Sequence, residues 1–129
     1  MTSVPAEIFK AYDIRGIVGR TLTPEIVNAI GQALGSEARA RGAEAVAVGR
    51  DGRISGPELC TALAGGLRAA GVDVIDIGMV ATPIGYFAAH HLGCGSVVMV
   101  TGSHNPPDYN GLKMVLGGVT LASTILRPL

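Results

Sequence analysis

The chain has 129 residues, of which 48% are hydrophobic and 4% aromatic, and its ten basic and ten acidic side chains give a formal net charge of zero. This length allows one domain with a mostly aliphatic core. The balanced charge argues against partners that attract basic proteins, such as nucleic acids and anionic membrane surfaces.

The N-terminal sequence and the two cysteines indicate a soluble protein of the cytoplasm. Residues 1–7 contain neither the basic nor the apolar region of a secretory signal, and no stretch approaches the roughly 20 apolar residues of a membrane span. Cys60 and Cys94 lie in apolar surroundings, so we interpret them as reduced buried thiols, with a disulfide as the less favoured alternative.

Helix-start signals occur three times along the chain. Thr23 suits an N-cap before a proline, and an apolar stripe at helical spacing follows until Gly42. Ser55 and Glu58 have the spacing of a capping box, which predicts a second helix ending near Gly71. Thr82 and the proline after it predict a third helix, ending near residue 93.

Four short apolar runs predict strands, at 45–48, 72–77, 96–101 and 111–116. Because strands and helices alternate, we expect an α/β fold of three layers (α/β/α), with a mostly parallel four-stranded sheet between the helices. The first segment, 8–19, is short and mixed, and no strand is predicted there. Ligands of such sheets bind beyond the carboxyl ends of the strands.

A turn-rich segment, TGSHNPPDYNGLK at 101–113, follows the third predicted strand. From local physics alone, a surface turn and a functional loop are about equally favoured, since Asn-Pro, Pro-Pro and Asn-Gly are all turn dipeptides. The functional interpretation gains from Ser103, His104 and Lys113, because cations beside a serine would favour an attached phosphate.

Other common sites are not supported. The turn at 49–52, after the strand predicted at 45–48, lacks the glycine fingerprint of dinucleotide binding. Neither a P-loop nor the hydrolase G-x-S-x-G elbow occurs in the sequence. His90 and His91 fit the last turn of a helix better than a metal site.

Four motifs in order resemble a known family: FKAYDIRG at 9–16, VGRDGR at 48–53, GMVATP at 78–83 and the 101–113 segment. Residues 8–118 resemble domain I of the bacterial phosphomannomutase/phosphoglucomutases, in the α-D-phosphohexomutase superfamily. We expect 8–118 to form this phosphoserine domain. The apolar tail, 119–129, departs from the family pattern and is interpreted as truncated, with domains II–IV absent.

The resemblance implies roles for particular residues. Ser103 matches the active-site phosphoserine, which passes its phosphoryl group to a hexose 1- or 6-phosphate through a bound 1,6-bisphosphate. Arg15 and Lys113 match cations near the reacting phosphate, with catalytic and substrate-binding roles. His104 matches the residue flanking the serine, for which proton transfer is one open role. Tyr12 matches a residue that lines the substrate cleft.

The resemblance also implies cofactors and partners. Mg²⁺ would bind a phosphoryl oxygen on Ser103, with its remaining ligands in the missing second domain, and a hexose 1,6-bisphosphate would act as activator. The expected substrates are mannose and glucose 1- and 6-phosphates, and the missing domains are expected partners. Because those domains supply the sugar-binding groups, this chain alone is expected to be inactive. The alternative is a non-catalytic module that binds a sugar phosphate or another chain.

Overall fold

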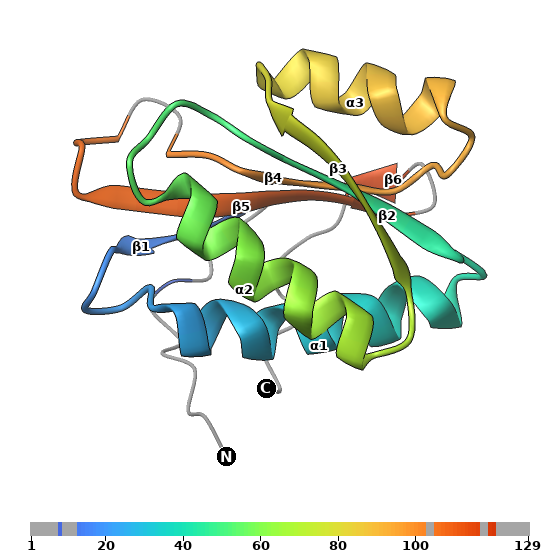
Figure 1. The fold of residues 1–129 in the computed structure, drawn as a ribbon, viewed down its shortest axis with the longest axis horizontal. Coiled ribbons are helices and arrows are strands. Elements are labelled where there is room, and N and C mark those ends of the chain that lie inside the picture. The colour runs from blue at the N-terminus through green and yellow to red at the C-terminus, as the bar shows by residue number, and fades with distance from the viewer. Residues whose placement is uncertain (1–7, 9–12, 103–104, 117–118, 121–129) are drawn as a thin grey trace.

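A β-sheet lies between two layers of helices in the computed structural model of the chain (Figure 1). The structure describes residues 8, 13–102, 105–116 and 119–120. The elements are β1 (Asp13–Ile17), α1 (Pro24–Ala40), β2 (Ala45–Arg50), α2 (Gly56–Ala69), β3 (Asp73–Met79), α3 (Thr82–His91), β4 (Val97–Val100), β5 (Tyr109–Leu116) and β6 (Val119–Thr120).

The sheet is mixed rather than mostly parallel, and it has more than the four strands expected from the sequence. Its order is β1-β5-β4-β2-β3, with the short β6 paired to β5. β2 runs parallel to β3 and β4, whereas β5 is antiparallel to β4, β1 and β6. The eight residues that join β4 to β5, 101–108, are fewer than the dozen or so that a parallel crossover needs. The chain must therefore reverse at this point.

The predicted helix starts are confirmed, but one predicted cap is wrong. Thr23 caps α1, and its Oγ1 accepts a hydrogen bond from the backbone N–H of Ile26 at 3.2 Å. Ser55 precedes α2 without capping it. Its Oγ instead accepts a hydrogen bond of 2.8 Å from Asn110 Nδ2 on β5. The hydroxyl group thus connects the start of α2 to a distant strand.

Helices cover both faces of the sheet, as expected. α1 and α2 pack together on one face, over a large aliphatic cluster that includes Ile14, Val98 and Leu112. α3 packs mainly on β2 and β4 on the other face, over a smaller cluster around Met99. The alternation of side chains along each strand therefore decides which helix layer a residue meets.

The structure bears on two expectations, the state of the cysteines and the absence of a membrane span. Cys60 and Cys94 are free and half-buried, which agrees with the interpretation as reduced thiols. None of the helices in the described part of the chain has both the length and the hydropathy that crossing a bilayer requires.

Candidate functional site

Five strands bring one end each to the same edge of the sheet. β2, β3 and β4 run in one direction, so they end together at this edge. β5 runs the other way and begins there, and Tyr109 at its start pairs with Ile17 at the end of β1. The loop between β4 and β5, which contains Ser103 in the sequence, therefore leaves and re-enters the sheet at its carboxyl edge.

Asp51, just after β2, holds the beginning of this loop. Its Oδ2 accepts hydrogen bonds from the Oγ1 of Thr101 and from the backbone N–H of Gly102, both at 3.0 Å. Its Oδ1 accepts a third, at 3.1 Å, from the backbone N–H of Arg53. Both carboxylate oxygens are thus engaged by the two residues that precede Ser103 and by the turn after β2.

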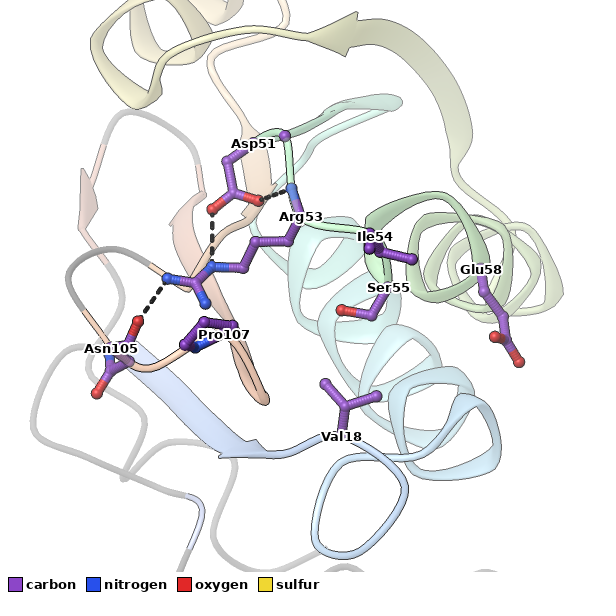
Figure 2. A pocket seen from close by; sticks show the side chains of 9 residues that line it. Val18, Asp51, Arg53, Ile54, Ser55, Glu58, Asn105 and Pro107 are labelled. Atoms are coloured by element: carbon purple, nitrogen blue, oxygen red, sulfur yellow. Dashed lines mark hydrogen bonds and ion pairs between the residues drawn. The ribbon is translucent and has the colours of Figure 1, made fainter.

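Arg53 holds the second half of the loop. Its Nη1 donates to the carbonyl oxygens of Pro106 at 2.7 Å and Tyr109 at 3.2 Å, and its Nη2 donates to that of Asn105 at 2.8 Å. Its Nε lies 3.4 Å from Asp51 Oδ2. Figure 2 shows the guanidinium group between Asp51 and Asn105. We call Asp51 and Arg53 together the loop clamp.

The loop clamp explains why residue 102 is a glycine. A Cβ atom there would overlap the guanidinium group of Arg53. Asn105 also closes the loop, since its backbone N–H and its Nδ2 donate to the carbonyl oxygen of Gly102, at 3.0 and 2.9 Å. The chain on both sides of residues 103 and 104 is therefore fixed by hydrogen bonds.

A cavity of about 700 Å³ opens beside the loop clamp (Figure 2). It is lined by Val18 after β1, by the turn at 51–55 with Glu58, and by Asn105 and Pro107 of the loop. Ile54 is 99% exposed at its rim. This hollow has the size of a small-molecule site and lies next to the predicted functional loop.

Arg15 and Lys113 share one face of the sheet. Their neighbours Ile14, Leu112 and Met114 pack into the cluster under α1 and α2, so alternation turns Arg15 and Lys113 to the opposite face. Both are half-buried. Arg15 pairs in register with Gly111, two residues before Lys113 on β5, which makes the two cations diagonal neighbours.

Gly111 gives the side chain of Arg15 its space. A Cβ atom at Gly111 would lie 3.0 Å from Arg15 Cγ and would also overlap the carbonyl oxygen of Ile14. The carbonyl oxygen of Gly111 accepts a hydrogen bond of 2.9 Å from the backbone N–H of Thr101. Arg15 is therefore next to the strand position at which the loop begins.

The predicted site residues divide into two groups. Arg15 and Lys113 are described, and the structure brings them together. Ser103, His104 and Tyr12 lie outside the described residues.

Sequence reasoning missed the roles of Asp51, Arg53 and Gly111. The VGRDGR motif drew attention to the first two, but no local pattern states which distant carbonyl groups an arginine will bind.

The described residues do not form a metal site. Within 8, 13–102, 105–116 and 119–120, no group of three His, Cys, Asp or Glu side chains could hold an ion. Asp51 is committed to three donors. His91 stacks on Phe87 with ring centroids 5.6 Å apart, on α3. Ser103, whose phosphoryl oxygen is expected to bind Mg²⁺, lies outside the described residues.

Comparison with known proteins gives a consistent picture. Residues 6–126 match the family model described as phosphoglucomutase/phosphomannomutase, alpha/beta/alpha domain I. The chain is 55% identical over 129 residues to a phosphoglucomutase of Neisseria meningitidis serogroup B, covering all of this chain and 28% of the relative. It is 58% identical over 127 residues to a phosphomannomutase/phosphoglucomutase of Pseudomonas aeruginosa, covering 98% of this chain and 27% of that protein.

Solved structures agree. A phosphoglucomutase/phosphomannomutase family protein from Burkholderia thailandensis superimposes with a TM-score of 0.90 at 57% identity, over 97% of this chain and 29% of the other. A putative phosphomannomutase from Thermus thermophilus gives a TM-score of 0.79 at 34% identity, over 84% and 25% of the two chains. The chain thus spans somewhat more than a quarter of the length of the relatives it matches.

Proposed function

The chain belongs to the phosphoglucomutase/phosphomannomutase family, in which it corresponds to the α/β/α domain I, and from this premise we propose that Ser103 is the phosphoryl carrier of a hexose-phosphate mutase. The substrates would be the 1- and 6-phosphates of glucose and mannose. The observation that supports this proposal most is the loop clamp, which fixes the chain on both sides of Ser103 at the edge of the sheet where Arg15 lies.

The proposed reaction has two phosphoryl transfers. In the first, the bond between phosphorus and Ser103 Oγ breaks while a bond forms to the free hydroxyl oxygen of the sugar phosphate. The sugar hydroxyl loses its proton to a base, and the released Ser103 Oγ takes up a proton. The product is a bound 1,6-bisphosphate. After the sugar turns round, Ser103 Oγ loses its proton and accepts the other phosphoryl group, and the released sugar oxygen takes up a proton. The serine ends as it began.

The residues of this chain would contribute orientation and charge. Such transfers depend mainly on positioning and on cations that offset the charge of the phosphoryl oxygens. The half-buried Arg15 and Lys113 suit the second task, because a cation in a partly dry site stabilises phosphate more than one in water. We assign substrate contact to Tyr12 and proton transfer at the sugar hydroxyl to His104.

Mg²⁺ and a hexose 1,6-bisphosphate are the proposed cofactor and activator. Mg²⁺ would supply charge neutralisation at a phosphoryl oxygen on Ser103. Since the described residues provide no ligand cluster, its other ligands would come from outside them. The two free cysteines support a reducing compartment, and we propose the cytoplasm.

An exchange of domains tests the proposal. Residues 1–118 of this chain would replace the matching segment of the Pseudomonas aeruginosa relative, and conversion of glucose 1-phosphate would be followed by a coupled assay. We expect an active chimera that loses nearly all turnover on Ser103→Ala. The matched control is Ser36→Ala on the exposed side of α1, which should leave the rate unchanged. Normal turnover by the Ser103→Ala chimera would refute the proposal.

A second candidate is a non-catalytic module that binds a sugar phosphate, and its support is the pair of half-buried cations, Arg15 and Lys113, on one face of the sheet. Titration of the 129-residue chain with glucose 1-phosphate distinguishes the two. Saturable binding that depends on Arg15 and Lys113, combined with an inactive chimera, would favour the module.

A further inference from the structure

A second cavity, of about 330 Å³, lies between α2 and the edge strand β3. Arg50 at the end of β2, Arg68 in the last turn of α2 and Asp76 on β3 bring charged groups to it. It opens on the α2 side of the sheet, next to β3. Arg15 and Lys113 lie on the opposite face, near β1, so the two sites are separate.

One face of α2 forms a wall of this cavity. Leu59, Leu63 and Leu67 point into the core, while residues 57, 60, 61, 64 and 68 line the cavity at helical spacing. Val48 and Val74 form the apolar floor from the sheet. The cavity therefore has both charged side chains and an apolar surface in its lining.

Arg50 has an unused donor in this place. Its Nε is buried and has no hydrogen-bond partner among the described residues. Its Nη1 lies 4.0 Å from Asp76 Oδ1, which is beyond hydrogen-bond distance. That carboxylate is 74% exposed, and its Oδ1 also accepts from the backbone N–H of Gly78 at 2.8 Å. A buried donor of this kind calls for an acceptor.

The other groups in the cavity add no negative charge. Burial raises the pKa of the Cys60 thiol to about 11, against the smaller opposing effect of Arg50, so the thiol is neutral at physiological pH. The hydroxyl of Thr61 donates to the carbonyl oxygen of Pro57 at 3.0 Å. Two guanidinium groups and one water-exposed carboxylate thus line the cavity, which leaves an excess of positive charge.

We propose that this cavity binds a small oxyanion of the phosphate-ester class, with Arg50 and Arg68 as its ligands. Guanidinium groups form paired, charge-assisted hydrogen bonds with the oxygens of phosphate. The volume of the cavity is near the lower end of the range for small-molecule pockets. It suits a phosphate ester whose small organic group lies over Val48 and Val74. A turn of the Arg50 side chain towards the anion would give its buried Nε an acceptor.

Arginine Nε–Hε signals in NMR spectra of the 129-residue chain test this site directly. The chain is titrated with inorganic phosphate, with glycerol 3-phosphate and with acetate, each at constant ionic strength maintained with sodium chloride. We expect saturable shifts of the Arg50 and Arg68 signals with both phosphates, tighter with the ester, and weaker binding of acetate. A carboxylate that binds as tightly as the ester would overturn the assignment to phosphate esters.

Variants separate this site from the proposed phosphoserine site. Arg68→Gln changes an exposed side chain and should weaken binding at least about tenfold, and Arg50→Gln should abolish it. The matched control Arg20→Gln removes an equal charge from an exposed turn and should leave binding unchanged, as should Lys113→Gln. Linear, unsaturated shifts, or equal weakening by Arg20→Gln, would refute the proposal. If Lys113→Gln retains binding at Arg50 and Arg68, this site is supported even if the mutase proposal fails.

Discussion

At the scale of single residues, Asp51 concentrates several interactions in one carboxylate. Its two oxygens accept from Thr101, Gly102 and Arg53, so one side chain connects the end of β2 to the end of β4. Hydrogen bonds to a charged acceptor are stronger than those between neutral groups. The carboxylate therefore contributes to the stability of the fold as well as to the position of the loop.

Asp51→Asn should destabilise the chain by about 1.5–3 kcal/mol, because the amide oxygen can take only one of the two carboxylate positions. Either the backbone N–H of Arg53 or the donors of Thr101 and Gly102 then lose this acceptor. Urea unfolding followed by circular dichroism measures the change. Asp108→Asn is the matched control, since that aspartate lies exposed on the same loop and should change stability by less than about 0.5 kcal/mol. Equal effects of the two substitutions would contradict the role of Asp51.

Deprotonation of Cys60 should lower the free energy of unfolding of the chain at alkaline pH. Its pKa rises from an ordinary value of 9.0 to about 11 in the folded state, mainly through burial. The folded state then holds its proton more tightly, so the stabilising contribution is complete below pH 9 and is lost as the pH rises through about 11.

Unfolding of the native chain and of a Cys60→Ala variant across pH 8 to 11 measures this contribution. Only the native chain should show the extra loss of stability. Parallel curves for the two proteins would show that the thiol is not shielded from water.

At the scale of elements, α1 and α2 meet at glycines that let their backbones touch. A Cβ atom at Gly66 would overlap the carbonyl oxygen of Asn28, and one at Gly31 would lie 2.7 Å from the carbonyl oxygen of Leu63. The contacting atoms belong to the backbone, so they cannot move aside as a side chain can. The close crossing of the two helices therefore depends on the absence of side chains at these positions.

Gly66→Ala should destabilise the chain by about 1–3 kcal/mol, because the helices must separate to admit the methyl group. Gly65→Ala, at the adjacent position of α2, is the matched control. Its methyl group would meet only the Nδ2 of Asn28, at 3.3 Å, and the substitution should be neutral or stabilising by up to about 1 kcal/mol through helix propensity. Thermal unfolding compares the two, and a Gly66→Ala chain as stable as the native one would refute the tight crossing.

At the scale of the whole molecule, stability should decrease from the centre of the sheet towards α3. β4 pairs with a strand on each side, and Val97–Val100 are fully buried. α3 rests on a small cluster and exposes large apolar side chains, among them Ile84 and Phe87. Regions with little buried apolar area open locally at low free energy.

Hydrogen exchange followed by NMR should therefore find the slowest amides in β4 and much faster ones throughout α3. The comparison is internal to one sample, so it needs no variant. Exchange in α3 as slow as in β4 would mean that the helix is held by contacts beyond those of its small cluster.

Much of the local structure was predictable from local patterns. Thr23 capped its helix as expected, and β2, β3, β4 and β5 lie at the four segments predicted from apolar runs bounded by turns. These features depend on residues within one turn of helix or one strand, where propensity and periodicity act directly. The resemblance carried the assignment of family, which the comparisons confirmed.

Contacts between distant segments were decided only by the tertiary structure. β1 was not predicted because DIRGI has little apolar character, and it exists because β5 offers it an edge. A hydrogen bond joins Ser55 to Asn110, 55 residues away in the sequence, and another joins Asp51 to Thr101, 50 residues away. An acceptor's partner depends on which strands become neighbours, and that order follows from packing the whole chain around one core. The sequence by itself thus determined that a loop with Ser103 joins two strands. The order of the strands in the tertiary structure decided that Asp51 and Arg53 hold that loop.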